Sequence, residues 1–119
     1  MAAEEARRGQ LWWVEWERGR GSEQRGTRPA LVIQNDTGNR YAATTIVAAV
    51  TTGGRALPVV VPVSASESGL PRDSFVNLAH ILTVDKSRLL RRCGEIGPAR
   101  MSQVDRAILV SLGVRGVLR

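Results

Sequence analysis

The chain has 119 residues, of which 43% are hydrophobic, and its 17 basic and 11 acidic side chains give a net charge of +6. This length and composition fit one soluble globular domain and exclude two domains of ordinary size. No apolar run approaches the roughly 20 residues of a membrane-spanning helix, and the single cysteine, Cys93, cannot form an internal disulfide, which fits a reducing cytoplasm.

The N-terminal residues 1–7 change from acidic to basic without an apolar stretch behind them, which is unlike a signal peptide. We expect them to form a disordered lead-in to a single domain over residues 8–119. Residues 10–17 (QLWWVEWE) then predict a strand, because they are rich in aromatic and branched side chains. Bulky side chains fall on both alternating faces, which predicts neighbours above and below the strand or one face at an interface.

A loop and a second strand come next. Residues 18–28 contain no apolar side chain and predict a loop, whereas residues 29–34 (PALVIQ) predict a strand that Pro29 opens, where its missing N–H costs least. Residues 35–40 (NDTGNR) have the composition of a turn. The continuous branched run at residues 44–52 predicts a buried strand.

The middle of the chain predicts a hairpin. Residues 53–55 begin with two glycines, and the apolar residues 57–63 are expected to return beside the strand at residues 44–52. A polar loop is expected over residues 64–73, followed by another strand at residues 74–82.

Near the C-terminus, the spacing of the apolar side chains changes from that of a strand to that of a helix. Residues 91–96 predict a short edge strand, and apolar side chains then recur at helical spacing, which predicts a terminal helix over about residues 99–113 that Gly113 ends. Ser102 with Asp105 is a weak start signal for that helix. Five or six strands with glycine-rich turns favour a mainly β fold, a small closed barrel with a C-terminal helix, over alternating βα units.

The positive charge points to an anionic partner. All but one of the basic residues are arginine, whose planar guanidinium suits phosphate better than lysine's ammonium; Lys86 is the exception. Codon usage also enriches chains in arginine, so charge alone does not distinguish nucleic-acid binding from a bias in composition. One histidine, one cysteine and scattered carboxylates offer no zinc-ligand spacing, so chemistry without a metal is expected.

The segment at residues 21–29 (GSEQRGTRP) is longer than a tight hairpin needs and gathers hydroxyl, carboxylate, amide and guanidinium groups. Loops of this kind, held by a rigid scaffold, carry function more often than the scaffold does. On chemistry alone, a solvated charged loop explains the segment equally well.

Several motifs follow one another in order along the chain. RGQ at residues 8–10, GSEQRGTRP and ALVIQND at residues 30–36 are followed by NR at 39–40, TIVAAVT at 45–51, LPRDS at 70–74 and TVDKSRL at 83–89. Together they resemble the MazF/PemK endoribonuclease toxins over about residues 8–112. This ordered series of motifs is far more specific than any one of them.

The resemblance implies a small SH3-like barrel that forms a homodimer. It also implies a cytoplasmic toxin of a type II toxin–antitoxin pair that cuts single-stranded RNA such as mRNA at short sequences, without the ribosome, a metal or a cofactor. In that reaction the 2′-hydroxyl attacks the adjacent phosphorus and leaves a 2′,3′-cyclic phosphate and a 5′-hydroxyl. The implied partners are the RNA substrate and a MazE-like antitoxin with an acidic, disordered tail.

Two catalytic residues carry over from the family motifs. Arg28 closes GSEQRGTRP, and Thr51 ends the buried strand. A guanidinium can clamp the charge that develops on phosphorus, although its firmly held proton argues against the acid–base work that the family also assigns to it. Thr51 would hold a phosphate oxygen or the departing oxygen, whereas without the motif it would be read as a plain strand residue.

The loop supplies further candidates. Ser22 and Gln24 resemble family positions that contact RNA. Glu23 either accepts the 2′-hydroxyl proton or orients Arg28 through an ion pair, and the structural role is favoured. Arg25 stands where many relatives have a small residue, so it either adds a phosphate contact or is a solvated surface charge.

The chain departs from the family at Ala79, His80 and Leu82, where relatives commonly carry Glu, Gln and Arg. This puts the cleavage sequence in question more than the activity. His80 is the only histidine and could carry a proton, but a hydrogen-bonded structural role is commoner for a strand histidine. Of the tryptophans, Trp12 and Trp13 are expected to pack, and Trp16 is left open as a platform for a base.

Two other functions remain possible on the same barrel. One is a non-catalytic toxin like the family that poisons DNA gyrase through exposed C-terminal aromatics, but residues 113–119 contain no aromatic side chain. The other is an RNA- or peptide-binding module without catalysis, against which the presence of both Arg28 and Thr51 argues.

Overall fold

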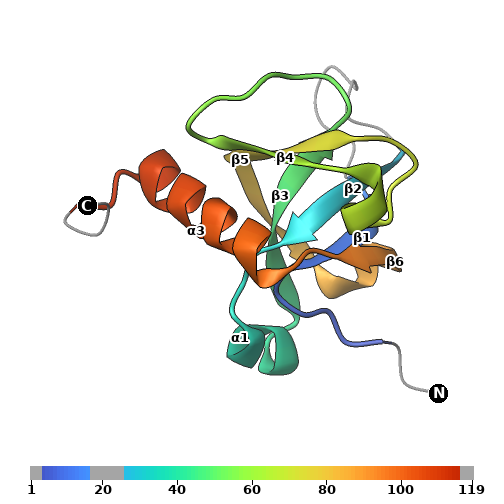
Figure 1. Cartoon of the computed structure of the whole chain (residues 1–119). Coiled ribbons are helices and arrows are strands. Elements are labelled where there is room, and N and C mark those ends of the chain that lie inside the picture. The colour runs from blue at the N-terminus through green and yellow to red at the C-terminus, as the bar shows by residue number, and fades with distance from the viewer. Residues whose placement is uncertain (1–3, 17–25, 116–119) are drawn as a thin grey trace.

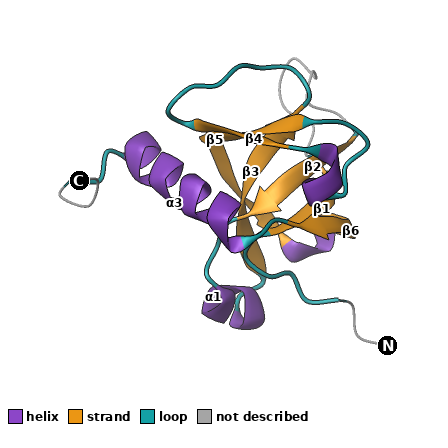
Figure 2. Cartoon of the chain, viewed as in Figure 1, coloured by secondary structure: helices purple, strands orange, loops and turns teal. Residues whose placement is uncertain are grey.

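The computed structural model describes residues 4–16 and 26–115. Within these ranges six strands form one antiparallel sheet in the order β4-β5-β3-β2-β1-β6, and a long helix crosses one face of it (Figure 1). The strands are β1 Gln10–Glu15, β2 Thr27–Val32, β3 Thr44–Thr51, β4 Val60–Val63, β5 Ser74–Asp85 and β6 Leu89–Glu95. The helices are α1 Asp36–Tyr41, α2 Ala65–Ser68, the 3-10 turn η1 Lys86–Arg88 and α3 Pro98–Leu112 (Figure 2). The mainly β class with a C-terminal helix is confirmed, and none of the described helices is long and apolar enough to cross a membrane.

The sheet is barrel-like but not closed. Over the described ranges its edge strands β4 and β6 do not pair with each other, which corrects the expectation of a closed barrel. Instead α2, which follows β4, lies backbone to backbone against β6 (Figure 1). A Cβ added to Gly94 would lie 2.2 Å from the carbonyl oxygen of Ser68, and one added to Gly69 would lie 2.1 Å from that of Cys93. Glycine at both positions therefore allows α2 to approach the β6 edge.

The predicted hairpin between residues 44–52 and 57–63 is wrong. β4 pairs with β5, with Val61 opposite Val76. The place beside β3 is taken by β5, which pairs with it from Thr44 opposite Asp85 to Thr51 opposite Phe75. The long pairing of β3 with β5 is therefore formed in place of the short hairpin that the glycine link suggests.

Two segments expected to be irregular contain short helices. The predicted turn at residues 35–40 becomes α1, because the Asn35 side chain accepts a hydrogen bond from the Gly38 amide at 2.7 Å. The buried Asn39 accepts a second bond from the Thr45 hydroxyl at 2.6 Å, which ties α1 to β3. In the same way, the polar loop at residues 64–73 contains α2, which Ser64 caps.

The terminal helix and the edge strand are confirmed with shifted bounds. α3 begins at Pro98, behind Gly97 as N-cap, so Ser102 and Asp105 do not start it. Gly113 ends it in the left-handed conformation with φ 70°, as glycine favours. β6 begins two residues before the predicted strand, and β5 continues to Asp85.

Hydrophobic clusters cover both faces of strands β1, β2 and β3. The first lies between the sheet and α3 and includes Leu11, Leu31, Ala48, Leu78, Val104 and Ala107. The second lies on the opposite face and includes Trp12, Val14, Trp16, Ala30, Val32 and Val47. Bulky side chains on both sides of β1 are explained by this two-sided burial.

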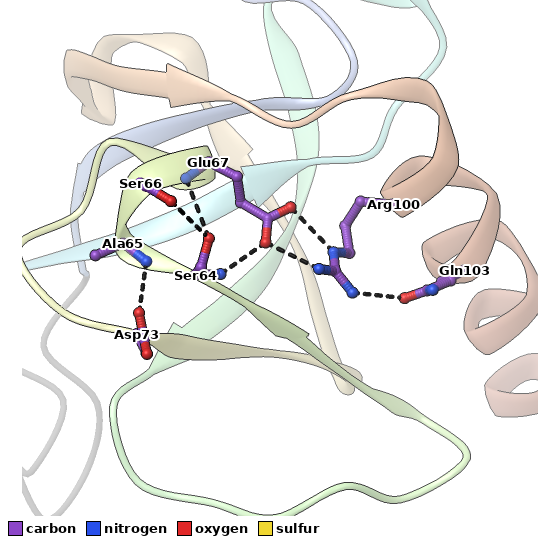
Figure 3. A network of polar contacts seen from close by, with 7 residues as sticks. All are labelled: Ser64, Ala65, Ser66, Glu67, Asp73, Arg100 and Gln103. Carbon is purple, nitrogen blue, oxygen red and sulfur yellow. Dashed lines mark hydrogen bonds and ion pairs between the residues drawn. The ribbon is translucent and has the colours of Figure 1, made fainter.

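An ion pair joins α2 to α3 (Figure 3). The Arg100 guanidinium donates to both carboxylate oxygens of Glu67 at 3.0 Å, and the Ser64 amide donates to the same carboxylate at 2.8 Å. The hydrogen bonds from Arg100, followed by the one from the Ser64 amide, lower the pKa of Glu67 from 4.5 to about 2. The carboxylate is therefore held ionised in the folded state.

We expect Glu67→Gln to lower the free energy of unfolding at pH 7 by about 1 kcal/mol, because the pair is only partly shielded from solvent. Since the folded-state pKa lies below the unfolded one, this contribution is present above about pH 4.5 and is lost as the pH falls toward 2. Urea unfolding of both proteins between pH 7 and pH 2 measures it, with Glu95→Gln as the control for removal of an exposed carboxylate. A deficit that stays constant down to pH 2 would contradict the role of the ion pair.

Candidate functional site

Strand pairing places Arg28 and Thr51 side by side. β2 begins at Thr27, so Arg28 projects from a strand and not from the end of a loop, which corrects the predicted boundary at Pro29. The β2–β3 ladder ends with Ala30 opposite Ala49, and counting two residues further along both strands in the same register brings Arg28 to the level of Thr51. Residues directly opposite each other in an antiparallel pair project from the same face, with Cβ atoms roughly 5 Å apart.

Both residues line one pocket of about 520 Å³ at this end of the sheet. Its walls come from four strands, β1, β2, β3 and β5, and from the loops after β3 and before β5. The lining residues are Trp13, Arg28, Pro29, Val50, Thr51, Thr52, Gly53, Leu70, Pro71, Arg72 and Ser74.

The chemistry of this lining suits an anion. It contains two guanidiniums, Arg28 and Arg72, and three hydroxyl side chains, while none of the described lining residues is a carboxylate. Arg28 is half-buried and makes no side-chain hydrogen bond or ion pair with another residue of the described ranges. Within the described ranges, no side chain competes with a ligand oxygen for its donors.

Two of the lining hydroxyls already have acceptors. Thr51 Oγ1 donates to the carbonyl of Gly53 at 2.6 Å, and Ser74 Oγ donates to the carbonyl of Arg72 at 3.0 Å. A hydroxyl has only one proton to donate. Thr51 therefore presents lone pairs to the pocket unless its hydroxyl turns away from Gly53.

The other predicted site residues lie elsewhere. Ser22, Glu23, Gln24 and Arg25 lie outside the described residues. His80 is exposed and stacks on Trp16, with ring centroids 5.9 Å apart, and it does not line the pocket of Arg28 and Thr51. The described part of that pocket thus contains no imidazole to act as a base.

Sequence reasoning missed Arg72, Ser74 and Trp13 as lining residues. Arg72 and Ser74 belong to the motif LPRDS, which was noted without a role. Trp13 is expected to pack in the core, and it does contact the first cluster. It also lines the pocket. The Arg91 guanidinium lies over its ring, 5.9 Å from the ring centroid.

Neither a metal centre nor a reactive thiol is apparent in the described ranges. No group of three or more histidine, cysteine, aspartate or glutamate side chains there could hold a metal ion. Cys93 is half-buried, and burial raises its pKa although Arg91 opposes the shift. The thiol is therefore protonated at neutral pH, which agrees with a structural role.

Comparisons with known proteins agree over nearly the whole chain. The profile of the family described as "PemK-like, MazF-like toxin of type II toxin-antitoxin system" matches residues 7–112. Proteins named Endoribonuclease MazF from Staphylococcus epidermidis and Staphylococcus saprophyticus are each 40% identical to this chain. The alignments cover 91% and 93% of this chain and 92% and 94% of those proteins.

Solved structures give the same result for the fold. An endoribonuclease in complex with its cognate antitoxin from a mycobacterial species is 28% identical, with a TM-score of 0.78 over 92% of this chain and 96% of that one. A MazE–MazF complex from Deinococcus radiodurans is 25% identical, with a TM-score of 0.78 over 94% and 99% of the two chains.

Proposed function

The chain belongs to the PemK-like, MazF-like family of type II toxin–antitoxin toxins, and on that premise we propose that it is an endoribonuclease that cuts single-stranded RNA. The pocket of Arg28 and Thr51 is the observation that carries the proposal. It combines two guanidiniums and three hydroxyls without a described carboxylate, at the place where the family motifs converge. The two guanidiniums of such a pocket attract a phosphodiester.

The proposed reaction is an internal transesterification. The 2′-hydroxyl gives up its proton and attacks the adjacent phosphorus, the bond to the 5′-oxygen breaks, and that oxygen takes up a proton. The products are a 2′,3′-cyclic phosphate and a 5′-hydroxyl, and no metal ion takes part.

Arg28 has the role of stabilising charge in this reaction. Its guanidinium donates several hydrogen bonds in a fixed plane and stays protonated, so it suits the oxygens of the developing phosphorane and does not suit a base. Arg72, which lines the same pocket, adds positive charge for the phosphate. Thr51 positions a phosphate oxygen when its hydroxyl turns from the Gly53 carbonyl to donate to that oxygen. For Glu23 the favoured role is to orient Arg28, and acceptance of the 2′-hydroxyl proton is the alternative.

Incubation of the pure protein with a long single-stranded RNA in EDTA tests the proposal. We expect discrete cuts by primer extension, 5′ ends that polynucleotide kinase labels directly, and cyclic phosphate at the 3′ ends. A matched RNA with 2′-deoxyribose at the mapped cut site should stay intact, because it lacks the nucleophile. Cutting of that RNA, or cutting only with added Mg²⁺, would exclude the mechanism, and intact RNA throughout would exclude the endoribonuclease.

The proposed partners follow from the same family. Endoribonuclease–antitoxin and MazE–MazF complexes are among the similar structures, which supports a MazE-like antitoxin with an acidic tail as the inhibitor of this chain. The net charge of +6 favours such a partner as well. We further propose that the toxin is a homodimer and acts in the cytoplasm.

A further inference from the structure

A bulge in β5 brings His80 out of the sheet. The β3–β5 register jumps between Ala48, which lies opposite Ile81, and Ala49, which lies opposite Asn77. Three residues of β5 are therefore extra to the ladder at this point. Leu78 fills the core, whereas Ala79 and His80 are exposed. Bulges of this kind redirect side chains and occur often beside functional sites.

The His80 ring lies on Trp16, just beyond the end of β1. The two ring planes are 26° from parallel, with 5.9 Å between centroids. Trp16 is only 8% exposed, and its Nε1 is buried without a hydrogen-bond partner in the described structure. A buried donor left without an acceptor is costly. One side of the imidazole meets the indole, and His80 is exposed.

The stacked pair is on the same face of the sheet as Arg28. Val14 is directly opposite Arg28 in the β1–β2 ladder. The Trp16 amide donates to the Gly26 carbonyl at 3.1 Å, which continues that pairing beyond the end of β1. Because alternate residues share a face, Trp16 and Val14 project on the side of Arg28. Trp16 and Arg28 are then diagonal neighbours, with typical separations of about 7–8 Å.

We propose that the exposed ring of His80, backed by Trp16, is a stacking platform for a nucleobase next to the phosphate bound at Arg28. Every base offers a flat π surface, and single-stranded RNA is commonly bound by stacking its bases on aromatic side chains, histidine included. The supported imidazole presents such a surface beside a phosphate-binding guanidinium. The proposal rests on the endoribonuclease function and adds to it a residue that binds substrate outside the cleavage pocket.

Binding of a short fluorescent RNA that spans the mapped cut site, with 2′-O-methyl at the cleaved nucleotide, tests the platform. His80→Ala is expected to weaken binding about tenfold, in the range of one stacked base. His80→Phe keeps a ring at this position and is expected to bind within about threefold of the wild type. In cleavage assays, His80→Ala should raise KM more than it lowers kcat, because stacking binds substrate and transition state alike.

A scan with abasic nucleotides locates the stacked base. In the wild type, one abasic position should weaken binding by about the same factor as His80→Ala, and the two changes together should be no worse than either alone. Binding of His80→Ala equal to that of the wild type, or losses that multiply at every abasic position, would overturn the platform while cleavage by the wild type upholds the endoribonuclease. A wild-type protein that neither binds nor cuts RNA would overturn both.

Discussion

Arg28→Ala is expected to lower kcat for RNA cleavage at least about 100-fold, the usual loss when a preorganised donor to a developing oxyanion is removed. Arg28→Lys should recover only part of that loss, because an ammonium keeps the charge but not the planar pair of donors. Stability should change little, since Arg28 makes no described ion pair or side-chain hydrogen bond. Single-turnover cleavage at saturating enzyme, alongside urea unfolding, measures both effects.

Arg55→Ala is the matched control for this experiment. Arg55 is an exposed arginine in the segment after β3, and it does not line the pocket. Its replacement removes the same charge and should reduce the cleavage rate by no more than about threefold, through a weaker general attraction for RNA. If the two alanine variants lose activity equally, Arg28 contributes only net charge and the clamp is refuted.

Gly94→Ala is expected to lower the free energy of unfolding by about 3 kcal/mol or more, at the upper end of effects for single substitutions. The added methyl would lie 2.2 Å from the backbone carbonyl oxygen of Ser68. Backbone cannot rotate away as a side chain can, so α2 would have to leave the β6 edge. Urea unfolding followed by tryptophan fluorescence and circular dichroism gives the change.

Gly53→Ala controls for the general effect of replacing glycine. A Cβ at Gly53 would have no heavy atom within 4 Å, and its φ lies outside the left-handed region. We expect this variant to stay within about 1 kcal/mol of the wild type. Equal stability of the Gly53 and Gly94 variants would show that α2 does not lie against β6 in solution.

Local patterns predicted the elements that depend on local forces. The branched run of β3 and the helical spacing of α3 specify their own conformations, and Gly113 ends α3 as its position suggests. The pairing of β4 with β5 depends on contacts between distant residues. The two glycines after β3 indicate that the chain turns, but they cannot indicate which strand takes the place beside β3.

The same difference between local patterns and contacts of distant residues applies to the site. Arg28 and Thr51 were found because each lies in a recognisable motif, and the β2–β3 register then brings them together. The sequence assigns Arg72 no role, because its place in the pocket depends on the β3–β5 pairing, which sets Phe75 opposite Thr51 and so brings the loop before β5 to the end of β3. Asn35 could have revealed α1, since asparagine is a strong N-cap residue, but the following Gly38 favoured a turn.

The burial of both faces of β1, β2 and β3 limits the positions at which the sequence can change without loss of stability. Apolar side chains cover both faces in the middle of these strands, so nearly every substitution there disturbs one cluster or the other. For the proposed endoribonuclease, changes of RNA preference are therefore expected at strand ends, at the β5 bulge and in the connecting loops, where a new side chain does not disturb the core. The fold separates the part of the chain that must stay constant from the part that can adapt to a different target.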